Sequence, residues 1–212
     1  MRTSEGIRQR LAGSAQQAAP VLLGALLTSE LDGHQVQVRI TEVEAYEGEL
    51  DPASYAFRGP TRRNQVMFGP AGRLYVYFVY GMHWCANVVC GPPGTAAAVL
   101  LRAGEIVAGE EFARERTPSS ISSAKLASGP ARLARCLGLS GGHTGLDLLD
   151  PNSPVRLDAL GPRAVHQTGP RVGIAVAVEQ PWRFWLPDEP SVSPYRPGGR
   201  KRRAGNRQTG QL

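Results

Sequence analysis

The stretch Val36-Gln-Val-Arg-Ile-Thr-Glu-Val-Glu-Ala-Tyr46 decides the fold of this chain. Apolar and polar residues alternate over its first half, which is typical of a β-strand that packs one face on a core. If no bulge intervenes, the same alternation puts Glu42 and Glu44 on the core-facing side. A buried carboxylate is costly unless it is hydrogen-bonded or paired. Two roles are therefore open: an ion pair with a core arginine, or a general base whose acidity is set by its pocket.

An aromatic hairpin follows, at Leu74-Tyr-Val-Tyr-Phe-Val-Tyr-Gly-Met-His-Trp-Cys-Ala-Asn-Val-Val-Cys90. Residues 74–80 and 84–90 read as its two strands, joined by a turn. Tyrosines in strands are usually half-buried packing residues, and Tyr75 and Tyr77 share a face. Tyr80 differs because it stands at the turn beside Gly81, where it gains nothing from the core. A large aromatic side chain at such a tip can act as a wedge between base pairs of a duplex.

The rest of the chain supplies both helices and strands. We expect helices at 16–27, interrupted at Pro20, and at 105–115 and 129–137. Further strands are expected at 96–102, 154–157, 171–178 and 183–186. The connection 47–72 is rich in Gly, Pro and Arg, and a loop of this length is usually functional or partly helical. The sum is an α+β fold, with a mainly antiparallel sheet surrounded by helices.

Length and charge favour one domain with a basic end. The chain has 212 residues, 42% of them hydrophobic, and a net charge of +6, which suits a single core. Six of the 24 basic residues lie in residues 196–212, so the other 18 balance the 18 acids. We expect a loose leader at 1–14, the domain at 15–195, and a disordered tail at 196–212. The tail either aids solubility or binds phosphates, and Arg58, Arg62, Arg63 and Arg73 form a second basic cluster.

Several classes of protein are disfavoured. The apolar run 21–27 is too short to span a bilayer, and the first residues do not read as a signal peptide. Three cysteines without a CxxC pair fit a reducing cytosol. His83 and Cys85 lack partners for a metal site, and no P-loop, GxGxxG or GxSxG motif occurs.

Taken together, the spaced motifs resemble the alkyladenine type of 3-methyladenine DNA glycosylase. The resemblance covers roughly residues 18–195 and rests on 42–46, 61–68, 74–82, Asn87, 100–102, 128–130, 171–173 and 183–184. It implies a curved sheet with a protruding hairpin for DNA. It also implies a monofunctional enzyme, without metal or cofactor, that flips alkylated purines such as 3-methyladenine out of double-stranded DNA. Hydrolysis of the N-glycosidic bond would leave an abasic site. We expect a monomer in the cytoplasm, associated with the nucleoid and not with a membrane.

The resemblance also implies a role for each matching residue. Glu44 would activate the attacking water, and Arg102 would help to place that water and the adjacent phosphate. The base pocket would consist of Tyr46, Tyr55, Tyr77 and Asn87, of which Asn87 rejects the amino group of guanine. Tyr80 would fill the gap left by the flipped nucleotide. The other expected DNA contacts are Thr61, Arg63, Met67 and Met82. At Tyr55 the chain departs from the family, which usually has histidine there.

Elementary chemistry fits these roles. A purine alkylated at N3 or N7 is cationic, so tyrosine faces attract it and it leaves easily. Residues 39–102, which contain most of the motifs, include no lysine. This argues against Schiff-base chemistry. Two alternatives stay open: a module that recognises damaged or distorted DNA without cutting it, and an RNA-binding domain of the same broad fold. Formation of abasic sites separates the glycosylase from the first alternative. The second predicts a preference for structured RNA and no use for Glu44.

Overall fold

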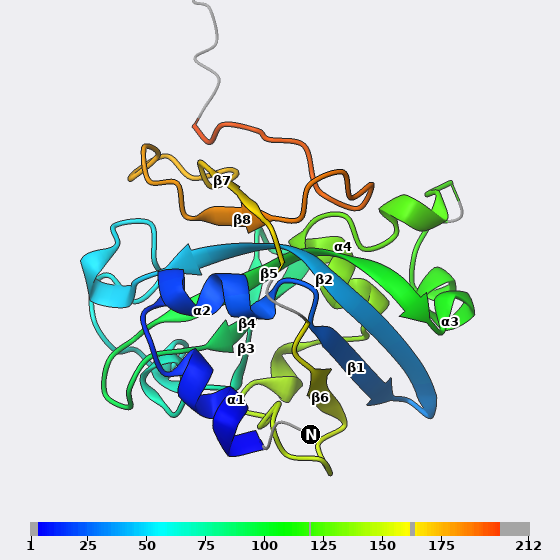
Figure 1. Cartoon of the computed structure of the whole chain (residues 1–212), viewed down its shortest axis with the longest axis horizontal. Helices are drawn as coiled ribbons and strands as arrows, with labels where there is room; N and C mark the ends of the chain where they lie inside the picture. Colours follow the sequence, from blue (N-terminus) through cyan, green and yellow to red (C-terminus); the bar gives the residue numbers. More distant parts are fainter. Residues whose placement is uncertain (1–3, 119, 162–163, 200–212) are drawn as a thin grey trace, which may run out of the picture.

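A curled antiparallel sheet is the frame on which the rest of the chain is arranged (Figure 1). The computed structural model describes residues 4–118, 120–161 and 164–199, and within them the sheet has eight strands. Their order is β3-β4-β5-β2-β1-β6, with β8 paired to β2 and β7 to β8. The strands are β1 (Leu26–Leu31), β2 (His34–Tyr46), β3 (Leu74–Val79), β4 (His83–Val89), β5 (Ala98–Ala108), β6 (Val155–Ala159), β7 (Gln167–Gly169) and β8 (Arg183–Trp185).

Short helices cover the sheet. They are α1 (Ser4–Leu11), α2 (Ala15–Leu22), α3 (Glu110–Glu115) and α4 (Pro130–Cys136), with 3₁₀ turns at Gly48–Leu50, Gln65–Phe68, Ser123–Lys125 and Gly141–His143. Helix α2 packs on β2 and β5, whereas α4 packs on β4 and β5. Buried leucines from the helices and the sheet, among them Leu22, Leu101 and Leu133, belong to one core. The predicted single-domain α+β fold is thus confirmed, as are the hairpin and the helix near Pro130.

The two carboxylates of β2 do not face the main core. Val36, Val38 and Ile40 belong to that core, but beyond them the core residues are Val43 and Ala45. The pairing of β2 with β5 shifts register on both sides of Glu42. Such bulges re-aim the side chains that follow them. The expectation that Glu42 and Glu44 continue the face of Ile40 was therefore wrong: both are buried, but on the opposite face of the sheet.

The N-terminal segment is more regular than expected. Residues 4–11, predicted to be a loose leader, form α1 and bury Ile7 and Leu11, which are four residues apart and so share a helix face. Arg8 binds Asp147 at 2.9 Å and ties this helix to the body. The next helix ends at Leu22 and not at residue 27, because the chain turns at Gly24 (φ +74°) and then pairs with β2 as strand β1.

Pairing between strands also explains why the ends of two other elements differ from those predicted. Strand β5 continues to Ala108, where a helix was expected, because it stays paired with β2 as far as Gln37. Helix α3 begins only after Gly109, which has a φ of +72°. Residues 171–178, expected to be a strand, form bends and turns, and the short strand lies earlier, at β7. The connection 47–72 contains two 3₁₀ turns, so it is partly helical as predicted.

The predicted tail falls mostly on residues 200–212, outside the described residues. In its described part, the carbonyl of Arg196 accepts a hydrogen bond from the N–H of Gly173 at 2.9 Å. Apart from the helix found in the predicted leader, the domain boundaries stay predictions. No helix among the described residues is long and apolar enough to cross a membrane.

Candidate active site

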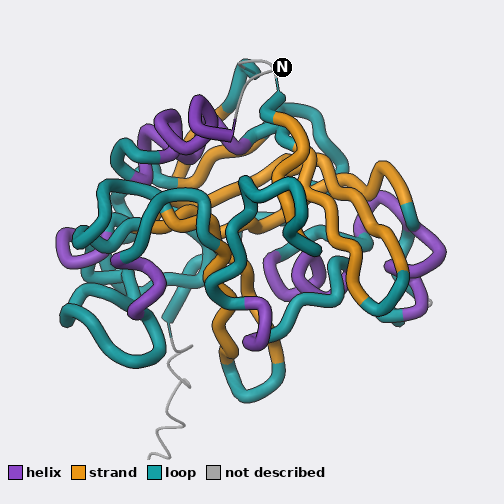
Figure 2. The backbone as a smooth tube through the Cα atoms, turned by 90° about the horizontal axis from the view of Figure 1, so that it is seen from below, coloured by secondary structure: helices purple, strands orange, loops and turns teal. Residues whose placement is uncertain are grey.

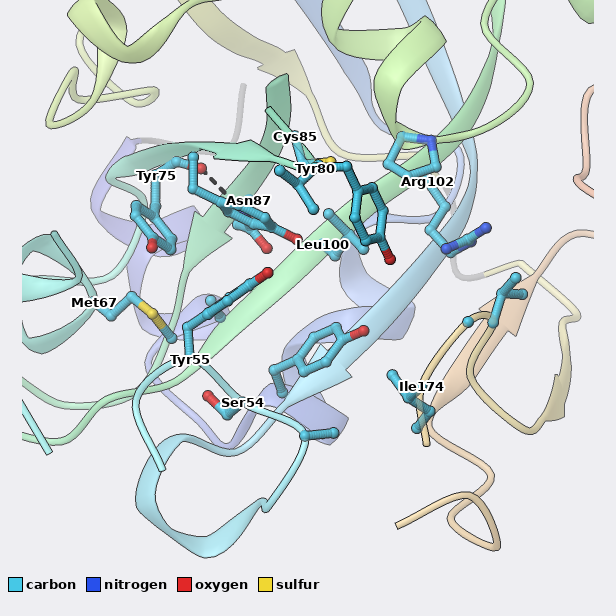
Figure 3. A pocket seen from close by; sticks show the side chains of 18 residues that line it. Ser54, Tyr55, Met67, Tyr75, Tyr80, Cys85, Asn87, Leu100, Arg102 and Ile174 are labelled. Carbon is cyan, nitrogen blue, oxygen red and sulfur yellow. Dashed lines mark hydrogen bonds between the residues drawn. The ribbon is translucent and has the colours of Figure 1, made fainter. Parts of the chain in front are cut away.

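A cavity of about 200 Å³ opens beside the β3–β4 hairpin (Figure 3). Its walls come from the hairpin, the loop 53–55, strands β2 and β5, and the segment 172–174. All four residues predicted for a base pocket line it, namely Tyr46, Tyr55, Tyr77 and Asn87. Tyr75, Tyr80, Met67, Arg102 and Val172 line it as well. The structure therefore brings together residues from well-separated parts of the chain.

The tyrosine rings shape the cavity for a flat molecule. The ring centroids of Tyr55 and Tyr77 are 4.8 Å apart at an interplanar angle of 60°, and those of Tyr75 and Tyr77 are 5.5 Å apart. The guanidinium carbon of Arg63 lies 5.1 Å from the Tyr55 ring centre. Burial raises the pKa of all three tyrosines, so their hydroxyls stay neutral. Neutral aromatic faces favour stacking with a planar, electron-poor ring.

Asn87 is fixed at the wall of this cavity. It lies opposite Tyr75 in the β3–β4 register, and its Nδ2 donates a hydrogen bond to the Tyr75 carbonyl at 3.1 Å (Figure 3). The side chain is buried, so it cannot easily turn away. A fixed amide at this position limits which exocyclic groups a bound ring can carry.

Glu44 lies immediately behind the cavity and has no exposed surface. The Tyr46 hydroxyl donates to its Oε2 at 2.9 Å, and the Val172 N–H donates to its Oε1 at 2.7 Å. The Nη1 of Arg102 is 3.4 Å from Oε1. Burial raises the pKa of Glu44, while Arg102, Val172 and Tyr46 oppose this shift. Tyr46, Arg102 and Val172 all line the cavity, so only these contacting residues separate the carboxylate from a molecule bound there.

Glu42 has a different environment from Glu44. Its Oε1 accepts hydrogen bonds from Arg102 Nε at 3.1 Å and from Arg183 Nε at 2.6 Å. Ser193 donates to it twice, from Oγ to Oε1 at 3.0 Å and from the backbone N–H to Oε2 at 2.8 Å. These contacts are those of a buried structural ion pair. Of the two roles open to the carboxylates of β2, this one belongs to Glu42.

Arg102 connects the two carboxylates. It is the residue that β5 inserts between the pairs Glu42↔Ala103 and Val43↔Leu101, and only 7% of its surface is exposed. Its Nη2 donates to Ser193 Oγ at 3.2 Å. The guanidinium is therefore held in place and still borders the cavity, as the prediction for this residue requires.

The hairpin carries exposed apolar residues at its tip. Figure 2 shows a hairpin that projects from the body, and at the tip of β3–β4 Tyr80 is 81% and Met82 is 66% exposed. Tyr80 has a φ of +54°, a conformation that few residues other than glycine adopt. It also borders the cavity, unlike Met82. Tyr80 is thus the residue that joins the exposed tip to the cavity.

The other predicted DNA contacts lie in different places. Thr61 and Arg63 belong to the loop beside the hairpin, where Arg63 donates to the Phe78 carbonyl. Met67 is only 2% exposed and forms part of the cavity wall instead of the surface. Sequence reasoning missed Val172, because a backbone N–H leaves no signal in a side-chain pattern. It also missed the contacts of Glu42 with Arg183 and with Ser193. These residues lie 141 and 151 positions after Glu42 in the chain, respectively.

Comparison with known proteins identifies the family to which this chain is similar. The model for methylpurine-DNA glycosylase (MPG) matches residues 9–190. A relative from Leifsonia xyli subsp. xyli is 51% identical over 197 residues, which is 89% of this chain and 92% of the relative. One from Nocardia farcinica is 52% identical over 186 residues, or 84% of this chain and 86% of the relative. Both bear the name 3-methyladenine DNA glycosylase. No group of His, Cys, Asp and Glu among the described residues could hold a metal ion.

Proposed function

Because this chain belongs to the methylpurine-DNA glycosylase family and is a DNA repair glycosylase, we propose that Glu44 is its general base and that the tyrosine-lined cavity receives the alkylated purine. The observation that carries the proposal is the position of Glu44: a buried carboxylate with a raised pKa, directly behind the cavity wall. Carboxylates whose pKa lies nearer to neutral pH are better matched to general-base catalysis.

The target base must first leave the duplex. An enzyme cannot reach the sugar carbon of a stacked base with a held water, so the nucleotide is flipped out at a cost of a few kcal/mol. Tyr80 is exposed at the tip and adjoins the cavity, so its ring fills the vacated space while the base enters. Met82 and the loop with Thr61 and Arg63 contact the neighbouring backbone.

The cavity then selects the base. A 3-methyladenine or related purine is cationic, and its attraction to the faces of Tyr46, Tyr55 and Tyr77 is worth about 0.5–2 kcal/mol. Asn87 occupies the position that the amino group of guanine would need, and its hydrogen bond to Tyr75 holds it there. Normal guanine is thereby excluded by a clash with a fixed amide.

Hydrolysis follows at the sugar. The C1′–N bond breaks with its electron pair moving to the cationic purine, which leaves as a neutral base. Water adds to the oxocarbenium-like carbon and transfers a proton to Glu44, and the product is an abasic site. This is the base half of inverting glycoside chemistry. Arg102 orients the water and the adjacent phosphate from its fixed position between Glu42 and Glu44. The enzyme works as a monomer at the nucleoid.

The test is excision from duplex DNA methylated at adenine N3, followed by alkali to reveal abasic sites. Glu44→Gln should lower the single-turnover rate by roughly 10²–10⁴-fold and leave DNA binding intact. Glu105→Gln, which changes an exposed carboxylate on β5, serves as the matched control. Excision by Glu44→Gln at the wild-type rate would remove Glu44 from the mechanism. Tight binding by wild type without abasic sites would instead favour the non-cutting DNA-recognition module.

A further inference from the structure

We propose that Arg171 and Asp51 are positioning residues that hold Glu44 in its catalytic orientation; this inference rests on the proposed role of Glu44 as general base. Neither residue lines the cavity, and neither was expected to act in the reaction. They are connected to Glu44 by two separate routes, one through the backbone and one through an aromatic ring.

Arg171 and Asp51 form a fully buried ion pair. Both side chains have no exposed surface, and the two Nη atoms of Arg171 donate to the two carboxylate oxygens, Nη2 to Oδ1 at 2.9 Å. The residues are 120 positions apart in the chain. Such a paired, two-point contact fixes the plane of the guanidinium as well as its position. We refer to this pair as the clamp.

The first route runs through the backbone. Arg171 directly precedes Val172, whose N–H donates to Glu44 Oε1 at 2.7 Å. Residues 170–175 belong to no helix or strand, and Gly173 has a φ of +77°. No ladder of hydrogen bonds therefore fixes this backbone. The buried side chain of Arg171 anchors the segment at the residue next to the donor.

The second route runs through Tyr46. The guanidinium carbon of Arg171 lies 4.6 Å from the centre of the Tyr46 ring and 5.0 Å from that of Trp182. The hydroxyl of the same Tyr46 donates to Glu44 Oε2. Arg171 Nη1 also donates to the carbonyl of Ala45 at 3.0 Å, between Glu44 and Tyr46 in the chain. The two hydrogen bonds to Glu44 thus depend on one arginine.

Asp51 extends the clamp to the opposite wall of the cavity. Its Oδ1 also accepts from the N–H of Ala53 at 3.0 Å, in the loop that carries Tyr55. The clamp consequently sets the position of Glu44 relative to both walls. General-base catalysis needs that accuracy, since a misplacement of about 1 Å can cost roughly 100-fold in rate.

The charges around Glu44 predict how a loosened clamp would show itself. The groups that face this carboxylate are Glu42 and Tyr46 from β2, Cys85 from β4, Arg102 from β5, and Arg171 with the Val172 N–H. The Val172 N–H lowers the pKa of Glu44, and the positive charge of Arg171 favours the ionised form. If the clamp is weakened, the pKa of Glu44 rises and the acidic limb of the pH–rate profile moves to higher pH.

The experiment compares Arg171→Lys and Asp51→Asn with wild type on duplex DNA containing 3-methyladenine. Lysine keeps the charge but loses the two-point contact, and asparagine keeps the shape of aspartate. We expect single-turnover rates about 10- to 100-fold lower, with affinity for the DNA changed less than about 3-fold. The acidic limb should move to higher pH in Arg171→Lys, which keeps both charges of the pair. In Asp51→Asn the loss of a negative charge beside Arg171 opposes that shift, so this variant is tested by its rate and its affinity for DNA. Arg8→Gln, which breaks a partly buried ion pair with Asp147 away from the cavity, should not move the acidic limb.

A double substitution decides whether the clamp acts through Glu44. In a Glu44→Gln background Arg171→Lys should cause no further loss of rate, because residues that work as a unit are non-additive. The proposal would be overturned if Arg171→Lys lowered the rate in the Glu44→Gln background as much as in wild type. It would also be overturned if the acidic limb of Arg171→Lys stayed at its wild-type pH. Where Glu44→Gln leaves no measurable excision, the pH limb decides alone. If both clamp variants melt below the assay temperature, Trp182→Leu replaces them. It removes only the indole ring whose centre lies 5.0 Å from the guanidinium carbon of Arg171, and it should also move the acidic limb to higher pH. An acidic limb that stays at its wild-type pH would reject the clamp.

The two proposals fail in different ways. Wild-type excision by Glu44→Gln removes the general base and the clamp together. An inactive Glu44→Gln with unaffected clamp variants leaves the general base standing and removes only the clamp.

Discussion

Glu42 and Glu44 lie two positions apart on β2 and are both without exposed surface, yet they receive different sets of donors. Glu42 accepts hydrogen bonds from two arginines and twice from Ser193. Glu44 accepts from one phenol and one backbone N–H, with Arg102 at 3.4 Å. The first arrangement is that of a buried structural ion pair, whereas the second leaves a carboxylate with a raised pKa beside a cavity.

This difference predicts opposite effects on stability. Glu42→Gln should lower the free energy of unfolding by about 3–5 kcal/mol, because it leaves Arg102 and Arg183 buried without their shared anion. Glu44→Gln removes a charge whose burial is unfavourable, so its stability should equal or exceed that of wild type. Urea unfolding of both variants measures this. Equal destabilisation would mean that Glu44 also has a structural role.

The raised pKa of Glu44 predicts the pH dependence of excision. Only the ionised carboxylate can accept the proton, so the rate should fall as pH drops through the pKa of this group. Because burial raises that pKa above its usual value of 4.5, the loss should begin at a higher pH than for an exposed glutamate. Single-turnover rates with saturating enzyme measure the limb. A rate that stays flat down to the pH where exposed carboxyls titrate would contradict the assignment.

Tyr80 should show a trade between stability and activity. Its left-handed backbone costs about 1 kcal/mol for a residue with a Cβ, so Tyr80→Gly should stabilise the fold or leave it unchanged. Tyr80→Ala keeps the strain and loses the ring. Both should reduce excision by a similar factor, since both lack the wedge. Melting temperatures and excision rates measured on the pair separate the two effects, and full activity in either variant would rule out a wedge.

Tyr55 should act through its ring and not its hydroxyl. Its side chain is about half exposed, it meets Tyr77 edge to face, and its hydroxyl has no hydrogen-bond partner among the residues that the structure describes. We therefore expect Tyr55→Phe to stay within about 3-fold of the wild-type rate on 3-methyladenine, and Tyr55→Ala to lose about 10-fold through lost stacking. A large loss in Tyr55→Phe would show that the hydroxyl contacts the base.

The basic loop beside the hairpin should control the salt dependence of binding. Arg62 is exposed, so Arg62→Gln should leave stability unchanged. If this residue contacts a phosphate, the slope of log affinity against log salt should decrease by about 1. Fluorescence anisotropy with undamaged and damaged duplexes checks this, and the decrease should be the same for both. An unchanged slope would place the DNA away from this loop.

Local patterns in the sequence determined much of this protein. The alternation at residues 36–46 predicted β2, and the tyrosines around Gly81 predicted the hairpin and its exposed tip. Glu44, Tyr46, Tyr77, Asn87 and Arg102 were expected in one site and do meet there. The strand and the hairpin could be predicted because strand alternation and turn residues are properties of neighbouring residues, whereas the membership of the site was implied by the resemblance of the spaced motifs to a known family.

Only the tertiary structure decided the surroundings of the two carboxylates. The bulges around Glu42 lie in its pairing with β5, and they carry both glutamates to the face opposite Ile40. Val172 acts through its backbone N–H, and Arg171 meets Asp51 across 120 positions. Such contacts depend on how distant segments pack, which no local period encodes. The residue types for the chemistry are thus written in the sequence, but the pKa and the orientation of Glu44 come from the packing around it.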